Sequence, residues 1–523
     1  MTAQAQPKMN FSIFMTLLGL SIAYAVTAVD PLLFTLNLTE ITKGLGIPPD
    51  LVGFTGGAAT LVVAAAVLGV GNLGDIYGLK RLLIYGFVSS IVFEALSALS
   101  PSYRFLIVMR FLDGLALAAL LGLSLALLSV SVPEQVRPVA IGFYIAINAI
   151  FYGVTPIIGG WVVQTFGWRA MFLIVVPVAV AGLLLTIKFV AEPPRKEGRK
   201  LDVVGIVLFG VALVGFVYGI GETLNGFTDP RTWIPLTISI VAFIAFVWWE
   251  RRQDEPALDL SLFGQPAFVV AGLATVSCDF LMGGYGVVLG QFGTAVLGLS
   301  AAAIGLFYLP GTLIASAAAI LAGYLISKYG ARLVLIWGML ILAASSAVMA
   351  TSASPTMSLW ILVLATFLNT LGANITSTPA SDIIVSHAPP ERAGTVTAMK
   401  PAFSKLGYSL SPTIYVLLLE VFFMRGWLAD TESRGLTDQQ AQQALNVAKN
   451  ASVGNSPSLA PYDPNLVERI VGVARMDFTE GLRITMLIVT LVPLVVAALA
   501  YFLIPRRPQS TPQPSPAVDQ QES

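Results

Sequence analysis

The chain has very little charge for its length. Of its 523 residues only 11% are charged, and the 29 basic side chains balance the 29 acidic ones, so the formal net charge is zero. A soluble domain usually carries about 25% charged residues, and a nucleic-acid-binding domain usually carries a basic surface. The composition therefore argues against an ordinary soluble protein and against a partner that is nucleic acid.

Cysteine and histidine are almost absent. The chain has one cysteine, Cys278, and one histidine, His387. One cysteine cannot form an internal disulfide, and the two residues together cannot build a Cys/His zinc site. The sequence also lacks the G-x-x-x-x-G-K-[ST] loop of an ATP-driven pump, and no nucleophile motif stands out. We therefore expect no enzyme, no cofactor and no bound metal.

Long apolar runs dominate what is present. Hydrophobic residues make up 56% of the chain, and about 20 consecutive apolar residues suffice for a membrane-spanning helix. The first run, from Phe11 to about Leu38, is too long for a cleaved signal, whose apolar region has about 7–15 residues. Fourteen spans are predicted, at 11–38, 50–71, 82–100, 104–130, 139–163, 169–190, 202–221, 232–249, 266–292, 301–326, 332–351, 358–380, 395–422 and 482–504.

Lysine and arginine are distributed unevenly between the two sides of such a chain. With both termini in the cytoplasm, 18 of them fall on the cytoplasmic side, whereas the short loops opposite hold four, Lys43, Arg104, Arg169 and Arg231. Positive residues gather on the cytoplasmic side of membrane proteins. We therefore expect fourteen spans rather than thirteen, in the plasma or inner membrane, with both termini cytoplasmic.

One polar stretch occurs twice. "GNLGDIYGLKRLL" at 71–83 returns as "GYLISKYGARLVL" at 323–335. The aligned pairs, each 252 residues apart, include Gly71 with Gly323, Gly78 with Gly330 and Lys80 with Arg332. Repeated halves are typical of secondary transporters. Ser327 stands where Asp75 would repeat, so a symmetric pair of loops is not expected.

The repeat and the span count together predict an all-α polytopic membrane protein. Two six-helix bundles would be related by a pseudo-twofold repeat, with two extra helices between them. The outward loop at 423–480 carries two short helix signals, a capping box at Thr437 and Gln440 and a start at Asp463–Pro464. The predicted parts are a cytoplasmic N-terminus (1–10), the first bundle (11–190), the inserted helices with linkers (191–265), the second bundle (266–505) and a disordered cytoplasmic tail (506–523).

The first polar stretch resembles the loop motif of the major facilitator superfamily, G-x-L-x-D-x-x-G-x-K-R. The matching residues are Gly71, Leu73, Asp75, Gly78, Lys80 and Arg81. "RFLDGLALAA" in the fourth span resembles the family's second motif through Arg110 and Gly114, although Asp113 stands where glutamine is common. "YGVTPIIGGW" in the fifth span is similar to the antiporter motif through Pro156, Gly159 and Gly160, although Thr155 replaces a glycine. With fourteen spans, the resemblance implies the drug:proton antiporter branch, driven by a proton gradient.

Five ionisable residues inside predicted spans are candidates for proton coupling or substrate binding: Asp30, Glu94, Arg110, Asp113 and Asp279. A charge within a bilayer costs several kcal/mol, so such residues are functional candidates by default. Arg110 and Asp113 lie three residues apart and can share one helix face; the alternative is a structural ion pair. Asp30 precedes a proline and could instead lie solvated at the rim, and Glu94 could lie near the end of its span.

The loop and the proline motif suggest conformational roles. Asp75 would accept hydrogen bonds at the start of the third span, where a helix dipole favours an anion. The resemblance implies that this loop latches the two halves together; Lys80 and Arg81 also satisfy the positive-inside pattern. Pro156 with Gly159 and Gly160 would form a hinge or allow close helix packing.

Three functions remain open. The first is a proton-coupled exporter of amphipathic or cationic compounds, with a small molecule, protons and the lipid bilayer as its partners and a monomer as its expected state. The second is a carrier of a lipid or a specific metabolite on the same fold. The third is a membrane receptor or sensor that transports nothing.

Overall fold

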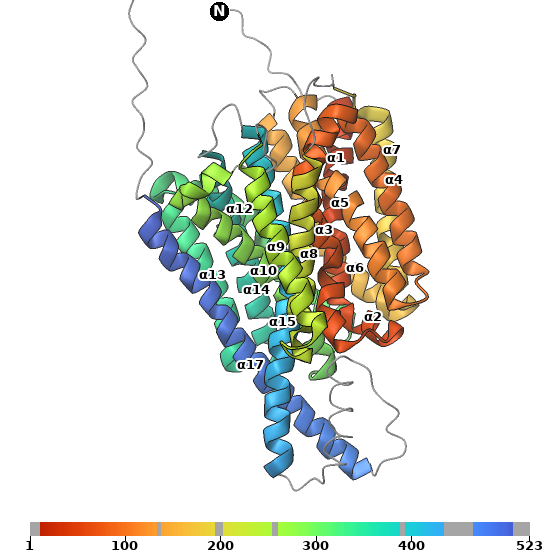
Figure 1. The fold of residues 1–523 in the computed structure, drawn as a ribbon, viewed down its shortest axis with the longest axis vertical. Coiled ribbons are helices and arrows are strands. Elements are labelled where there is room, and N and C mark those ends of the chain that lie inside the picture. The colour runs from red at the N-terminus through yellow and green to blue at the C-terminus, as the bar shows by residue number, and fades with distance from the viewer. Residues whose placement is uncertain are drawn as a thin grey trace, which may run out of the picture.

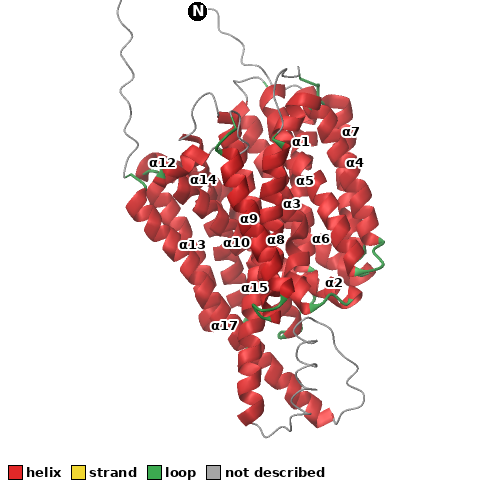
Figure 2. Cartoon of the chain, in the orientation of Figure 1, coloured by secondary structure: helices red, strands yellow, loops and turns green. Residues whose placement is uncertain are grey.

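A computed structural model describes residues 11–132, 137–193, 202–253, 260–386, 393–433 and 464–505. Over these residues the chain is helical and contains no strand (Figure 2). Helices are expected because lipid offers no hydrogen bonds, and a helix satisfies its backbone groups internally. Thirteen described helices are long and apolar enough to cross a membrane, and the 21-residue α12 adds a fourteenth long helix where a span was predicted.

The helices fall into two halves joined by an inserted pair (Figure 1). The first half comprises α1 (Phe11–Leu36), α2 (Leu38–Leu45), α3 (Pro49–Tyr77), α4 (Leu79–Ala98), α5 (Tyr103–Ser131), α6 (Arg137–Phe166) and α7 (Ala170–Phe189). The insertion comprises α8 (Val203–Gly221), η2 (Glu222–Asn225), α9 (Pro230–Glu250) and η3 (Leu260–Gly264). The second half comprises α10 (Pro266–Ala295), α11 (Ala301–Leu306), α12 (Leu309–Tyr329), α13 (Ala331–Ser352), α14 (Leu359–Ser386), α15 (Ala393–Ser433) and α17 (Pro464–Leu503).

Some predicted boundaries were wrong. The span at 301–326 is divided into α11 and α12. The segment at 423–480 is also shorter than expected, because α15 continues to Ser433 and α17 begins at Pro464. A span predicted from hydropathy stops where the apolar residues stop. The helix itself can continue into polar sequence until its backbone hydrogen bonding is interrupted. Pro464 is the predicted first residue of a helix, but the helix expected from Thr437 lies outside the described residues.

Polar caps begin several of the helices. The side chain of Ser102 accepts a hydrogen bond from the backbone N–H of Phe105 at 3.3 Å. Asp202 does the same for Gly205 at 2.9 Å, at the start of α8. Such caps satisfy backbone donors that have no partner within the helix. They place the helix starts where the apolar runs are flanked by serine or aspartate.

Equivalent glycines join corresponding helices of the two halves. Gly78 links α3 to α4 with φ 105°, and Gly330 links α12 to α13 with φ 84°, a region that favours glycine. The Gly78 N–H donates to the Gly74 carbonyl at 2.9 Å, and the Gly330 N–H donates to the Ile326 carbonyl at 2.8 Å. The repeat read from the sequence is therefore present in the backbone.

The two halves pack closely at the end of the bundle where α1 finishes and α2 lies, which we call the lower end (Figure 1). A Cβ on Gly53 of α3 would lie 2.5 Å from the Thr413 Cα of α15. A Cβ on Gly57 would collide with the Ser409 carbonyl oxygen of the same helix. Small residues allow this backbone-to-backbone packing, so the halves are closed against each other at the lower end.

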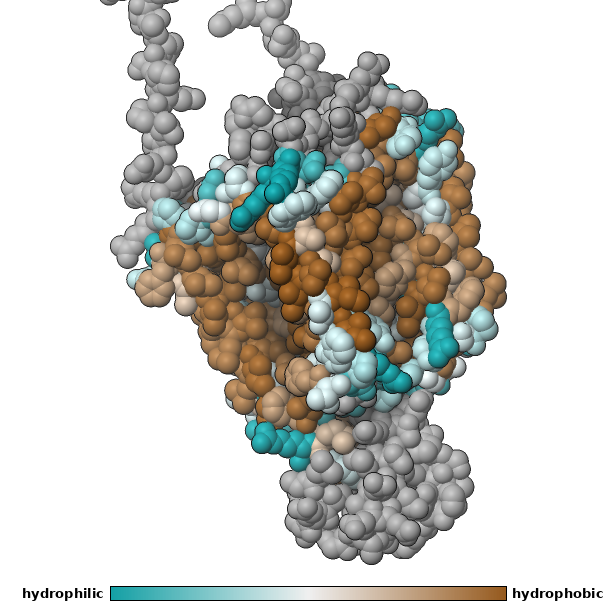
Figure 3. Space-filling view, in the orientation of Figure 1, coloured by the Kyte–Doolittle hydropathy of each residue, from teal (hydrophilic) through white to brown (hydrophobic). Residues whose placement is uncertain are grey.

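Apolar side chains cover the middle of the bundle. In Figure 3 hydrophobic residues form a broad zone, and hydrophilic residues gather towards its two ends. Many of the exposed side chains are large and apolar, such as Trp233 and Ile240 of α9. An exposed apolar zone of this kind is expected on a protein that lies in lipid.

The inserted helices pack against the outside of the first half. A Cβ on Gly69 of α3 would collide with Ile206 of α8, so these two helices lie in close contact. Within the inserted pair, the Trp249 indole N–H donates to Asp202 Oδ1 at 2.8 Å. At its end α8 also approaches the second half, because a Cβ on Gly221 would lie 3.6 Å from Thr413 of α15.

Candidate functional site

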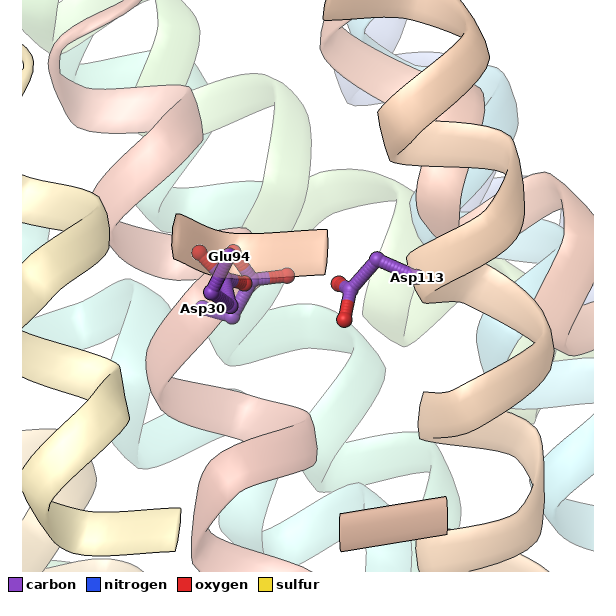
Figure 4. Close-up of side chains that lie close together, drawn as sticks. All are labelled: Asp30, Glu94 and Asp113. Atoms are coloured by element: carbon purple, nitrogen blue, oxygen red, sulfur yellow. The ribbon is translucent and has the colours of Figure 1, made fainter. Parts of the chain in front are cut away.

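Three carboxyl groups from three helices meet inside the first half. Asp30 comes from α1, Glu94 from α4 and Asp113 from α5, and one oxygen of each lies within 4.8 Å of the others. Figure 4 shows Asp30 and Glu94 side by side, with Asp113 pointing toward them. We call these residues and Arg110 the acidic cluster. The solvated position considered for Asp30 is wrong, because only 2% of this residue is exposed.

Arg110 holds the three carboxyl groups together. Its Nη2 donates to Asp30 Oδ2 at 2.5 Å. Its Nη1 donates to Glu94 Oε1 at 3.3 Å and to Asp113 Oδ2 at 3.4 Å. The forked guanidinium offers five donors in one plane, which suits several carboxylates at once.

The acidic cluster is sealed from solvent in this conformation. Arg110 is 1% exposed, and Glu94 and Asp113 are 0% exposed. The guanidinium carbon lies 4.8 Å from the ring centre of Phe34 and 6.0 Å from that of Phe172, distances at which cation–π attraction operates.

The charges in the acidic cluster do not balance if every group is ionised. Three carboxylates would then face one guanidinium, and uncompensated buried charge is costly. Glu94 Oε2 is buried without a hydrogen-bond partner among the described residues, so a proton on it could be donated to Asp30, with which Glu94 interacts. A guanidinium already lies among the three carboxyl groups, and its fixed positive charge disfavours a metal cation at the same place, so the arrangement suits protons better.

Asp279 lies apart from the acidic cluster, on α10 of the second half. It is half-buried, accepts a hydrogen bond from Ser404 and interacts electrostatically with Lys405 and Lys400, all of α15. The structure thus brings four of the five predicted ionisable residues together and places the fifth in a second polar group.

Lys400 and Lys405 are two of the 18 basic residues that the positive-inside count assigns to the cytoplasmic side, and the structure places their side chains against neighbouring helices rather than in a loop. Both lie within α15, among helices of the bundle. Lys405 Nζ donates to the Thr27 carbonyl of α1 at 3.0 Å, and Lys400 Nζ donates to Ser377 Oγ of α14 at 3.1 Å. The signal was in the sequence, since both positions fall inside the predicted span 395–422.

The first polar stretch is arranged differently from the prediction. Asp75 belongs to the end of α3, not to the start of α4, because α3 continues to Tyr77. Gly71 also lies within α3, and the side chain of Asp75 lies outside the described residues. The anion at the start of α4 is Glu192 instead. Its two carboxylate oxygens accept the backbone N–H groups of Lys80 at 3.1 Å and Arg81 at 3.0 Å.

Glu192 was missed because it lies more than a hundred residues away in the sequence. It follows α7, and Lys80 Nζ also donates to the Ile187 carbonyl of that helix at 3.0 Å. These described contacts of the loop therefore tie α4 to α7 within the first half. An anion at this position stabilises the exposed N–H groups of the α4 terminus.

The second copy of the stretch makes a different contact. Arg332 donates a hydrogen bond to the Tyr501 carbonyl of α17, and its guanidinium lies 4.7 Å from the centre of the Tyr501 ring. Gly330 forms the turn described above, and a Cβ on Gly323 would meet nothing within 4 Å. The two copies therefore differ in their described contacts, and the asymmetry expected from Ser327 stays a prediction, because its side chain lies outside the described residues.

The proline motif lies in an unbroken helix. Pro156 is inside α6, and both Gly159 and Gly160 are buried. A Cβ on Gly159 would collide with Leu33 of α1, and the Pro156 carbonyl lies against Gly305 of α11. The motif is therefore a close-packing surface that touches both halves. The similar role of Gly53 and Gly57 was not recognised in the sequence.

Comparison with known proteins gives a consistent result. Residues 10–412 match the model of the Major Facilitator Superfamily. The chain is 28% identical over 515 residues to the multidrug resistance protein Stp of Mycobacterium tuberculosis (strain CDC 1551 / Oshkosh), covering 95% of this chain and 93% of that protein. It is 28% identical over 493 residues to the tetracenomycin C resistance and export protein of Streptomyces glaucescens, covering 93% and 91% of the two chains.

A solved structure has the same fold. It is a bacterial homologue of the human lysosomal transporter Spinster, in an inward-facing and unoccupied conformation. The TM-score is 0.63 at 16% identity, over 93% of this chain and 95% of that one.

Proposed function

Because the chain belongs to the major facilitator superfamily, we propose that it exports amphipathic drug-like compounds, cationic ones included, in exchange for protons. It is a multi-pass membrane protein of a transporter family rather than an enzyme, and its relatives include multidrug resistance and drug export proteins. The proton gradient would be the energy source, no cofactor would be needed, and the working unit would be a monomer.

The acidic cluster carries this proposal. A proton that neutralises Asp30 would remove the charge that holds α1 to Arg110 of α5, whose contact is 2.5 Å long. Charge-assisted hydrogen bonds are roughly twice as strong as neutral ones, so proton binding would loosen α1 from α5. Because α1 also packs against α10 of the second half, with Gly290 lying against the Leu36 carbonyl, that loosening would be transmitted to the other half.

Orientation follows from the positive-inside pattern. With both termini cytoplasmic, the lower end faces the outside, and the close packing at Gly53 and Gly57 closes the outer side. Protonation and release of the acidic cluster would then accompany alternation between this conformation and one open to the outside. Alternating access of this kind is largely the rocking of one repeat against the other.

Reconstituted vesicles test the proposal directly. Uptake of two dyes on a common xanthene scaffold, cationic rhodamine 6G and anionic sulforhodamine B, is measured with an acidic lumen and again after an uncoupler. We expect at least one dye to accumulate only with the gradient, and Asp30→Asn to abolish that accumulation. Glu480→Gln, which alters an exposed ion pair with Arg483 at 3.3 Å, is the control.

Two results would contradict the proposal. One is uptake that is indifferent to pH and to the uncoupler. The other is the absence of transport of either dye by a protein that purifies with tightly bound lipid, which would favour the lipid carrier.

A further inference from the structure

Two lysines of α15, Lys400 and Lys405, have no ion-pair partner among the described residues, and Lys405 reaches across to the first half. Lys400 and Lys405 are half-buried. Each donates to an uncharged oxygen, that of Ser377 or that of Thr27. Within the described ranges no carboxylate lies within ion-pair distance of either ammonium group. Ionisable groups at membrane depth usually face a partner or a watery cavity.

Nearby acids do not balance these two charges. Asp279 is the acid that interacts with both lysines. Lys405 also interacts with Asp30, but that carboxylate is already held by Arg110 at 2.5 Å. Among the described residues, the group of Lys400, Lys405 and Asp279 therefore carries an excess of one positive charge when all three are ionised.

Tyrosines from both halves lie near Asp279. Tyr152 of α6 interacts with Asp279, Tyr408 and Tyr308 of the second half. Tyr24 of α1 is half-buried, and its ring stacks on that of Tyr144 with centres 4.7 Å apart. Aromatic faces of this kind bind flat apolar molecules.

One of these tyrosines has an unused donor. Tyr308 is 4% exposed, and among the described residues its hydroxyl group has no hydrogen-bond partner. A buried hydroxyl without a partner costs free energy, and an acidic oxygen of a bound molecule would satisfy it. An acidic oxygen would likewise give each ammonium group a charged hydrogen-bond partner.

The acidic cluster is not available to a cargo molecule in this conformation. Glu94, Arg110 and Asp113 are at most 1% exposed, whereas Lys400, Lys405 and Asp279 retain partial exposure inside the bundle. The partly exposed charges are thus two positive and one negative, whereas the three carboxyl groups of the acidic cluster are sealed.

We propose that Lys400 and Lys405, with Asp279 beside them, bind an acidic group of the cargo, so that the preferred substrates are amphipathic aromatic molecules with net negative charge. The inference rests on the proposed export function and narrows its cargo. Because Asp279 reduces the excess positive charge of the two lysines to one, a cargo with a single net negative charge matches the site best. The tyrosines would contact the aromatic part of the cargo.

Equilibrium binding separates this inference from transport. Purified protein in detergent is titrated with rhodamine 6G and with sulforhodamine B, whose charges do not change near neutral pH. We expect sulforhodamine B to bind more tightly. Lys405→Gln and Lys400→Gln should each weaken its affinity about tenfold, the usual order for losing one charged hydrogen bond, and should leave or improve the binding of rhodamine 6G. Asp279→Asn should shift the ratio of the two affinities the opposite way.

The control is Lys328→Gln, which changes an exposed lysine whose Nζ lies 5.2 Å from the centre of the Tyr329 ring. It should leave both affinities unchanged. The inference is overturned if the wild-type protein prefers rhodamine 6G, or if neither lysine variant changes the ratio of affinities. Because no gradient is present, those results leave proton-coupled export standing. Conversely, gradient-independent uptake in vesicles would overturn the export mechanism and leave the charge preference of the binding site intact.

Discussion

Replacing Arg110 with glutamine tests whether the acidic cluster depends on its single positive charge. Removing one partner of a buried ion pair costs about 3–5 kcal/mol, because the other charge stays buried and uncompensated. Arg110 faces three carboxyl groups at 2.5, 3.3 and 3.4 Å, and all four residues are almost fully buried. The variant has one way to avoid that cost, which is to keep the carboxyl groups protonated.

The free-energy cost of keeping the carboxyl groups protonated depends on pH. Holding one carboxyl group protonated costs about 1.4 kcal/mol for each pH unit above its ordinary pKa of about 4, hence about 5 kcal/mol at pH 7.5 and about 2 kcal/mol at pH 5.5. The folded variant then binds more protons than its unfolded chain, so its stability rises as pH falls. Arg110→Gln should therefore be strongly destabilised at pH 7.5 and less so at pH 5.5.

The assay is thermal unfolding of the detergent-solubilised protein at both pH values, followed by tryptophan fluorescence. Arg483→Gln is the matched control, because its exposed pair with Glu480 should contribute at most about 1 kcal/mol. Adding Asp113→Asn to Arg110→Gln should recover part of the loss by removing one acid. An Arg110→Gln midpoint equal to that of Arg483→Gln, or a loss of the same size at both pH values, would refute the reasoning.

Two further predictions concern the α4 start and the closure between the halves. Glu192→Gln should weaken the α4 start by about 1 kcal/mol, seen as faster amide exchange in its first turn. Glu40→Gln, in the exposed pair with Lys43, is the control, and equal exchange in both variants would contradict the assignment. Gly57→Ala should abolish dye transport, because its Cβ would collide with the Ser409 carbonyl. Gly472→Ala, where a Cβ meets nothing within 4 Å, should transport normally; transport by both variants would show that this close packing is dispensable.

The fold could be predicted largely from the sequence because membrane helices obey a simple constraint. Apolar length locates the spans and the lysine and arginine bias decides their number. The repeat was visible because Gly78 and Gly330 serve the same turn. The end of α15 at Ser433 was misplaced because it lies in polar sequence, where hydropathy carries no signal, and the continuation of the helix that starts at Pro464 into the last span was not expected.

The candidate site was predictable only residue by residue. The free-energy cost of placing a charge within the bilayer identified the candidates Asp30, Glu94, Arg110 and Asp113. A single sequence does not show that three helices bring the carboxyl groups to one guanidinium. Glu192 was invisible because its role depends on α7 ending beside the start of α4. The contact of Lys405 with α1 was not predicted, because its position inside a span does not say which neighbouring helix it reaches.

The length of the last two long helices has a mechanical consequence. α15 has 41 residues and α17 has 40, hence each is about 60 Å long, roughly twice the thickness of the hydrocarbon core. Figure 1 shows both continuing beyond the other helices at the lower end. A rod fixed at one end moves most at its tip, so a rotation of the second half by about 10° would displace the tip by about 10 Å for a 60 Å arm. A small rotation of the second half would therefore produce a large displacement at the far ends of these two helices. A pair of spin labels, one of them at such an end, could measure it as a change in distance.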